Sequence, residues 1–152
     1  MMANVPTIRG ARPEDAPAVS DCIAAAYGHY VARIGKPPAP MLEDYAKVIQ
    51  RHDVFVLNVS EKIIGVLVLI KQERSILLTN VAVHPDHQGQ GFGRKLIAIA
   101  EEKARNVGFD AVTLYTNEQM TENIELYKKL GFEETERRLE KGYHRVYMRK
   151  TV

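Results

Sequence analysis

A strand, a glycine-rich loop and a helix follow one another directly in one segment, and this constrains the fold more than any other feature. Residues 81–94 read Val-Ala-Val-His-Pro-Asp-His-Gln-Gly-Gln-Gly-Phe-Gly-Arg. The apolar run ends at a proline turn, and Gly89, Gly91 and Gly93 leave the backbone bare before helical periodicity begins. The first N–H groups of a helix lack intrahelical partners, and the helix dipole favours negative charge there. Because glycine lets a ligand approach the backbone closely, the segment predicts an anion site.

The length and composition of the chain indicate one globular domain. The 152 residues suffice for a hydrophobic core, so a single domain is expected over residues 1–152. Hydrophobic residues make up 45% and charged residues 26%, which is typical of globular proteins. The net charge of +2 comes from interleaved basic and acidic residues, so neither a nucleic acid nor a membrane surface is expected as a partner.

No segment of the sequence indicates a membrane span, a signal peptide or a disulfide. The longest apolar run, residues 63–70, is far too short to cross a bilayer. Residues 1–4 lack the charged-then-apolar pattern of a signal peptide, so we expect a cytoplasmic protein. Cys22 is the only cysteine and is expected in the core. His84 and His87 are interpreted as solvated turn residues, because no third ligand is obvious, and no metal is expected.

Apolar periodicity and turn residues predict a mixture of helices and strands. Helices are expected at about residues 13–30, 42–51, 91–107 and 122–130. Strands are expected at about residues 7–9, 53–59, 62–71, 75–83, 111–116, 132–137 and 143–149. The proline-rich residues 35–40 predict a stiff loop. This order predicts an α/β (α+β mixed) fold, with a mixed, mostly antiparallel sheet of about seven strands flanked by four helices.

The step from strand 75–83 through helix 91–107 to strand 111–116 predicts a parallel, right-handed βαβ crossover. The buried stripe of that helix is expected to be Leu96, Ile97, Ala100, Ala104 and Val107. The charged residues 133–138 predict an exposed, mixed-charge edge.

Two short motifs, at a characteristic spacing, carry a resemblance to a known family. Residues 88–93 read Gln-Gly-Gln-Gly-Phe-Gly, fit the pattern Gln/Arg-x-x-Gly-x-Gly/Ala, and resemble the acetyl-CoA loop of the GNAT N-acetyltransferase superfamily. Residues 126–132, Leu-Tyr-Lys-Lys-Leu-Gly-Phe, resemble a second signature of that family. The predicted element order is also the GNAT order. The resemblance implies that acetyl-CoA donates an acetyl group to a primary amine, of a small molecule or a peptide, by direct transfer in a ternary complex.

The resemblance implies that CoA lies along the glycine loop and the strand before it. The loop residues expected around the pyrophosphate are Gln88, Gly89, Gln90, Gly91, Phe92, Gly93 and Arg94. The strand residues whose backbone is expected to bond the pantetheine arm are Val81, Ala82 and Val83. The family leaves room for this arm because strands 75–83 and 111–116 splay apart.

One expected CoA contact departs from the family pattern. Met120 stands where many members carry an asparagine. We expect Asn117 or Asn123 to supply that amide contact, and Asn123 is favoured because it lies one helical turn before Tyr127.

The resemblance places Tyr127 beside the thioester sulfur, where its phenol could protonate the leaving thiolate. The histone-acetylating branch carries a glutamate base at the position of Leu77. With no carboxylate there, we expect the amine proton to leave through water ordered by Asn80, Thr79 or backbone carbonyls. Alternative proton acceptors are Glu118 and His84.

The first two helices and their loop cover the acceptor site in GNAT folds. The residues expected to bind the acceptor are Tyr27, Tyr30, Met41 and Tyr115. Residues expected beside them are Pro37 to Pro40, Tyr45, Asn117 and Tyr143. The fold does not determine the acceptor, so a metabolite, an antibiotic amine and a protein N-terminus stay open.

Several alternatives stay open at this point. The loop glycines could only shape a turn, and Tyr127 could be only a packing residue. The missing strand carboxylate favours, as an alternative function, a CoA-binding sensor or regulatory module without turnover. An acyl group larger than acetyl is a further alternative, because the sequence does not give the depth of the pocket. An exposed last strand is compatible with a homodimer.

Overall fold

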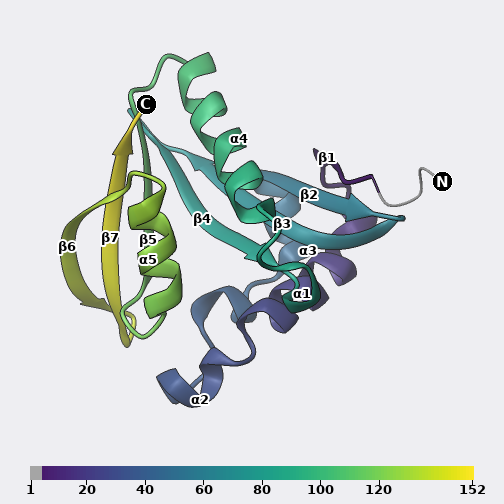
Figure 1. The fold of residues 1–152 in the computed structure, drawn as a ribbon, viewed down its shortest axis with the longest axis horizontal. Helices are drawn as coiled ribbons and strands as arrows, with labels where there is room; N and C mark the ends of the chain where they lie inside the picture. The colour runs from purple at the N-terminus through teal and green to yellow at the C-terminus, as the bar shows by residue number, and fades with distance from the viewer. Residues whose placement is uncertain (1–4) are drawn as a thin grey trace.

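A seven-stranded sheet forms the centre of the molecule, with helices packed on both faces (Figure 1). The computed structural model describes residues 5–152, so the signal-peptide prediction for residues 1–4 lies outside the described residues. The strands are β1 (Thr7–Gly10), β2 (Asp53–Val59), β3 (Lys62–Lys71), β4 (Ile76–Val83), β5 (Ala111–Asn117), β6 (Glu133–Glu140) and β7 (Tyr143–Thr151). Their spatial order is β1-β2-β3-β4-β5-β7-β6, and each neighbouring pair except β4 with β5 is antiparallel. The predicted fold class is confirmed.

The helices connect these strands and cover the sheet. They are η1 (Pro13–Asp15), α1 (Ala16–Tyr27), α2 (Tyr30–Ile34), η2 (Ala39–Leu42), α3 (Tyr45–Arg51), η3 (Pro85–His87), α4 (Phe92–Asn106) and α5 (Thr121–Lys129), where η marks a 3₁₀ turn. The helix predicted over residues 13–30 is divided, so α1 and α2 replace one predicted helix. The break falls at Gly28, in keeping with the low helix propensity of glycine.

The second predicted helix begins later than expected, at Tyr45 instead of residue 42. The Asp44 side chain caps it by accepting a hydrogen bond from the Ala46 N–H at 3.1 Å. The end of the proline-rich segment forms η2, a single tight turn, and the rest of residues 35–40 is a loop as predicted.

The sheet opens between β4 and β5. Only three residue pairs join these parallel strands, residues 76–78 with residues 112–114, and the strands then diverge (Figure 1). The predicted parallel step and the predicted splay are therefore confirmed. From Thr79 onward the edge of β4 that faces β5 has no strand partner among residues 5–152, and such an edge can bond an extended ligand.

A β-bulge lies where the sheet opens. The register of β4 against β3 shifts at Thr79, which has no partner in that ladder. Because side chains alternate along a strand, the extra residue places Leu78 and Asn80 on opposite faces of the sheet. Leu78 belongs to the core beneath α4, whereas Asn80 bonds Tyr27 and Tyr45 on the side of α1 and α3. The bulge thus brings a buried amide to the opening.

Two hydrophobic cores hold the helices against the sheet. The predicted stripe of α4 is confirmed at four buried positions, Leu96, Ile97, Ala100 and Ala104. The prediction for Val107 is wrong: this residue is 37% exposed, because α4 ends at residue 106. Cys22 is buried in the core beneath α1 as predicted, and burial raises the pKa of its thiol to about 11.

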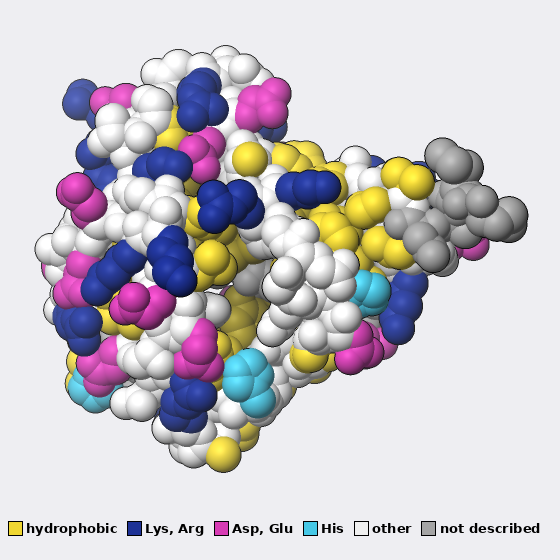
Figure 2. Space-filling model, in the orientation of Figure 1, with side chains coloured by type: hydrophobic (Ala, Val, Ile, Leu, Met, Phe, Trp, Pro, Cys, Tyr) yellow, Lys and Arg dark blue, Asp and Glu magenta, His cyan; other side chains and the backbone are white. Residues whose placement is uncertain are grey.

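The two edge strands are β1 and β6, so the prediction that the last strand, β7, lies exposed at an edge is wrong. The chain turns back after β6 and inserts β7 between β5 and β6. The expectation of a homodimer was based on an exposed last strand, so the structure does not support it by that route. Residues 133–138 are exposed on β6, which confirms the mixed-charge edge, and Arg137 pairs there with Glu134 at 2.9 Å. Basic and acidic side chains are likewise interspersed over the face shown in Figure 2. Within residues 5–152, no helix is long and apolar enough to span a membrane.

Candidate active site

The loop between β4 and α4 presents bare backbone at a helix N-terminus. Gly91 is the N-cap of α4 with a φ of 83°, and Gly89 has a φ of 79°, a left-handed region that favours glycine. A Cβ atom at Gly89, Gly91 or Gly93 would meet no atom within 4 Å, so open space lies beside the loop. The Gln88 side chain donates to the Val83 carbonyl at 3.0 Å and ties the loop to the end of β4. The loop therefore has the geometry of the predicted anion site.

A cleft of about 480 Å³, here called the loop cleft, extends from this loop past β4 to α5. The predicted CoA-binding residues that line it are Val81, Ala82, Val83, Gln88, Gly89, Gly91, Phe92, Gly93, Arg94, Asn123 and Tyr127. Gln90 does not line the loop cleft and is exposed, and Asn117 lines a different space. Of the two candidate asparagines, therefore, only Asn123 lies where a CoA contact is predicted.

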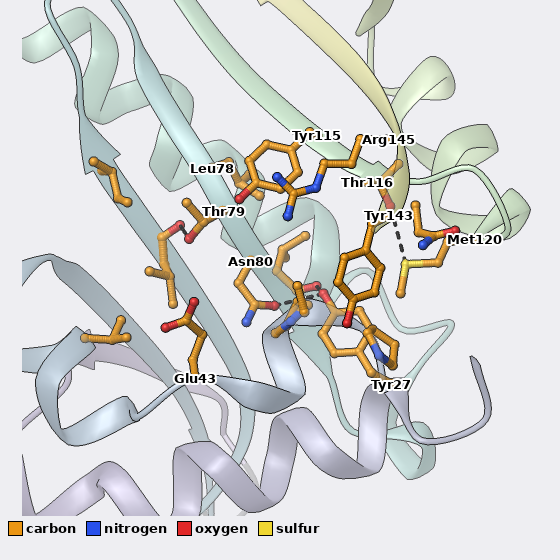
Figure 3. A pocket seen from close by; sticks show the side chains of 18 of the residues that line it. Tyr27, Glu43, Leu78, Thr79, Asn80, Tyr115, Thr116, Met120, Tyr143 and Arg145 are labelled. Carbon is orange, nitrogen blue, oxygen red and sulfur yellow. Dashed lines mark hydrogen bonds between the residues drawn. The ribbon is translucent and has the colours of Figure 1, made fainter. Parts of the chain in front are cut away.

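A second space of about 200 Å³, here called the sheet cavity, lies on the other side of the opening (Figure 3). Its walls come from α1, η2, α3, β3, β4, β5, α5 and β7. Tyr27, Val81 and Tyr127 line both the loop cleft and the sheet cavity. The two spaces therefore meet at these three residues.

The residues predicted to bind the acceptor are divided between the two spaces. Tyr27 and Tyr115 line the sheet cavity, whereas Tyr30 lines only the loop cleft. Met41 lines neither space and packs instead against the core beneath α1. The further residues expected in this region that do line the sheet cavity are Pro38, Ala39, Pro40, Tyr45, Asn117 and Tyr143.

Tyr127 lies at the junction with its phenol unengaged. The residue is 4% exposed, and its ring packs edge-on against Phe132 with the centroids 5.8 Å apart. Its hydroxyl makes no hydrogen bond with any residue that the structure describes. Burial, with a smaller contribution from Tyr30, raises the pKa of Tyr127 above its ordinary value. The phenol is therefore protonated at neutral pH.

A buried network joins Asn80 to two tyrosines. The Tyr27 hydroxyl lies 2.8 Å from Asn80 Oδ1 and 3.0 Å from the Val81 carbonyl. Asn80 Nδ2 donates to the Tyr45 hydroxyl at 3.0 Å, and that hydroxyl donates to the Pro40 carbonyl at 2.5 Å. Burial raises the pKa values of Tyr27 and Tyr45, so both stay neutral. Both ends of the Asn80 amide are thus occupied by protein.

The predicted alternative proton acceptors lie outside both spaces. Glu118 is 3.7 Å from Arg137, and His84 accepts a hydrogen bond from the Asp86 N–H at 3.2 Å. Neither side chain lines the loop cleft or the sheet cavity. The titratable groups that do line the sheet cavity, and that the sequence analysis did not single out, are Glu43, His52 and Arg145.

Arg145 is the most unusual of these missed residues. It is 9% exposed, and its guanidinium stacks over the Tyr115 ring at 4.4 Å from the centroid (Figure 3). A signal was present in the sequence, because strand residues two apart share a face and Arg145 follows Tyr143 by two positions. No cluster of His, Cys, Asp and Glu that could hold a metal occurs among residues 5–152.

The structure thus has a mixed sheet that opens between β4 and β5, with two adjoining spaces at the opening. Residues 50–134 match the family described as Acetyltransferase (GNAT) domain. The chain belongs to this family of acetyltransferases, as the two motifs indicated.

Curated relatives and solved structures agree with this assignment. An uncharacterized N-acetyltransferase of Bacillus subtilis, YvbK, is 28% identical over 65% of this chain and 63% of its own length. The chain spans 63%, 31% and 50% of three of the curated relatives it matches. The PaiA N-acetyltransferase of Thermoplasma acidophilum, solved with coenzyme A, superposes with a TM-score of 0.81 at 18% identity, over 97% of this chain and 99% of that one. A GNAT family acetyltransferase of Elizabethkingia anophelis, solved with acetyl-CoA, gives 0.68 at 20% identity, over 97% and 98%. The structural likeness confirms the fold.

Proposed function

We propose that the protein transfers an acetyl group from acetyl-CoA to a small primary amine, directly and within a ternary complex. The observation that carries this proposal is the meeting of the loop cleft and the sheet cavity at Tyr127. Two substrates bound in these spaces would place their reacting atoms side by side, and such positioning supplies a large part of catalysis.

The loop cleft fits the donor. Bare glycines with positive φ at the N-terminus of α4 suit a pyrophosphate, and the unpaired edge of β4 suits the amide arm of pantetheine. The solved GNAT structures with coenzyme A or acetyl-CoA support this choice. The residues that would hold the donor are the predicted ones that line the loop cleft, while Gln90 and Asn117 lie outside it. Acetyl-CoA supplies an acetyl group already activated as a thioester.

The sheet cavity fits a small acceptor. Its volume of about 200 Å³ lies below the roughly 300–1,000 Å³ of pockets for drug-sized ligands, which favours a small metabolite over an antibiotic. Its walls are largely apolar and aromatic, and include Val68, Ile70, Leu78 and Met120.

The chain's own residues would handle two protons. An amine with a pKa of roughly 8 to 10.4 must lose a proton before it can react. The Asn80 amide is already engaged, and the Thr79 hydroxyl donates to the Val68 carbonyl at 3.4 Å. Water for this step would therefore be ordered by the lone pairs of Thr79 Oγ1 and by nearby carbonyls, and Glu43 lines the same cavity. We assign Asn80 a positioning role, in which it holds Tyr27 and Tyr45. Tyr127, neutral and without a hydrogen-bond partner among the described residues, would protonate the leaving thiolate.

The test is Tyr127→Phe, which removes one hydroxyl and keeps the ring. Turnover is followed by thioester loss with a panel of primary amines, and donor binding by calorimetry. General acid catalysis contributes about 10²–10⁴-fold, so kcat is expected to fall by that factor while the Kd for acetyl-CoA changes little.

The matched control is Tyr147→Phe, because Tyr147 lines neither space and bonds Glu140 on β6. This control is expected to keep the wild-type kcat. An unchanged kcat in Tyr127→Phe would remove Tyr127 from the proposed role. Tight donor binding without turnover of any amine would instead favour the sensor alternative, and faster turnover with a longer acyl-CoA would favour the larger acyl group.

A further inference from the structure

Arg145 is a largely buried residue whose guanidinium makes no hydrogen bond with any of residues 5–152. The residue is 9% exposed and lines the sheet cavity. Within residues 5–152 its only charged neighbour at salt-bridge distance is Glu140, whose Oε2 lies 4.0 Å away. That carboxylate is already used by others, because its Oε1 accepts from Tyr147 and from Arg138.

The nitrogen atoms of this guanidinium reach the sheet cavity, because none of them is among the side-chain atoms of residues 5–152 that are both sealed from solvent and without a partner. An arginine carries five N–H donors, so a ligand in the cavity can bond those that the protein does not use. The sheet cavity offers a place for such a ligand, because the side chain extends from β7 into it (Figure 3).

The sheet holds this side chain in a defined orientation. Arg145 pairs with Asn117 in the ladder of β5 and β7, so Tyr115 is its diagonal neighbour on the same face. The Tyr115 ring lies under the guanidinium at 4.4 Å from its centroid. Stacking fixes the plane of the guanidinium and leaves its N–H groups free to bond in that plane.

We propose that Arg145 binds a carboxylate of the acceptor, so that the acceptors are small primary amines carrying a carboxylate, such as α-amino acids with apolar side chains. A planar guanidinium fork matches a carboxylate through two parallel hydrogen bonds. The apolar residues of the sheet cavity suit the rest of such a molecule. Glu43, on the far side of the cavity, adds a charge of opposite sign for the amine (Figure 3). This inference rests on the proposed function.

The experiment compares matched acceptors and matched variants. The acceptors are the proteinogenic L-amino acids and their carboxamides, which lack the carboxylate. The variants are Arg145→Gln, Arg145→Lys and the control Arg137→Gln, which removes an exposed arginine that lines neither space. The readouts are kcat/KM for each acceptor and thermal unfolding followed by circular dichroism.

The wild type is expected to prefer the acids. Removing one partner of a buried, charged pair costs enough for Arg145→Gln to lose at least about 30-fold in kcat/KM on the acids, with less than about 3-fold change on the amides. Arg145→Lys keeps the charge without the fork and is expected to fall between the two, so it reports even if Arg145→Gln does not fold. Arg137→Gln is expected to match the wild type.

Other outcomes overturn the inference. If amides react as well as acids, or if Arg145→Gln lowers both alike, Arg145 has only a structural role. If no amine reacts although acetyl-CoA binds, the proposed function fails, and calorimetry of the CoA-saturated protein with the same acids decides the carboxylate site separately. Binding of acids but not amides, lost in Arg145→Gln, then supports the site, whereas no binding of any acid refutes it.

Discussion

The buried network around Asn80 gives a sharp prediction about stability. Tyr27→Phe keeps the aromatic ring, so no cavity forms, but it removes the hydroxyl that lies 2.8 Å from Asn80 Oδ1. Asn80 is 4% exposed, so water cannot readily replace that donor. An unsatisfied buried acceptor costs about 1–3 kcal/mol. With an m-value of about 2 kcal/mol/M, a loss of 2 kcal/mol moves the urea midpoint by about 1 M.

The assay is urea unfolding followed by circular dichroism, with Tyr143→Phe as the control. Tyr143 makes the same kind of bond, a hydroxyl to the Pro37 carbonyl at 2.7 Å, but at an exposed site where water can substitute. The control is expected to change the free energy of unfolding by less than about 0.5 kcal/mol. Equal losses in the two variants, or a loss below that limit in Tyr27→Phe, would refute the assignment of the network as a buried, satisfied unit.

Three further predictions concern the glycine loop and the N-terminal turn. Gly91→Ala forces a left-handed φ on alanine, so the free energy of unfolding, measured by thermal unfolding, should fall by about 1–2 kcal/mol. Gly93→Ala should keep the wild-type stability but raise the KM for acetyl-CoA, because its methyl group would fill open space beside the loop. Asp15→Asn should lower stability at pH 7 by about 1–2 kcal/mol, because Arg9 and the Arg12 N–H both bond the carboxylate at 2.7 Å. These bonds lower the pKa of Asp15, so its contribution is present above about pH 4 and is lost as pH falls through the lowered value; the difference between wild type and variant should therefore close in acid denaturation curves.

The sequence predicted those parts of the fold that local patterns determine. Strands 53–59 and 62–71 were placed to the residue, because a two-residue turn with positive φ at Ser60 and Glu61 separates two apolar runs. The helix predicted over residues 91–107 ends one residue earlier than predicted, at Asn106, so Val107 lies outside it. The candidate donor residues were found because their motif is continuous in the chain.

The remaining features depend on contacts distant in sequence. Strict alternation would place Leu78 and Asn80 on one face, and only pairing with β3 reveals the bulge at Thr79. Either late strand could in principle neighbour β5. The apolar Val146 and Met148 were nevertheless a usable signal, because a strand with a buried face belongs inside the sheet.

In the site, too, residues in continuous motifs were found from the sequence, and residues placed by contacts distant in sequence were missed. Arg145 was missed because charge is read by default as a solvated surface feature, and its burial arises from Tyr115 on another strand. Asn117 was expected to contact CoA and lies instead on the sheet cavity, because it stands at the end of β5, on the far side of the opening.

The three residue pairs between β4 and β5 are a short stretch of strand pairing for a sheet of this width. This pairing joins two parts of the sheet, one that runs from β1 to β4 and one that runs from β5 to β6. A donor whose amide arm lay along β4 would add hydrogen bonds between these two parts of the sheet, and they would be lost when the donor left. The stability of the contact between the two parts would then rise with the concentration of acetyl-CoA. Amide hydrogen exchange in β4 and β5 would slow as that concentration rose.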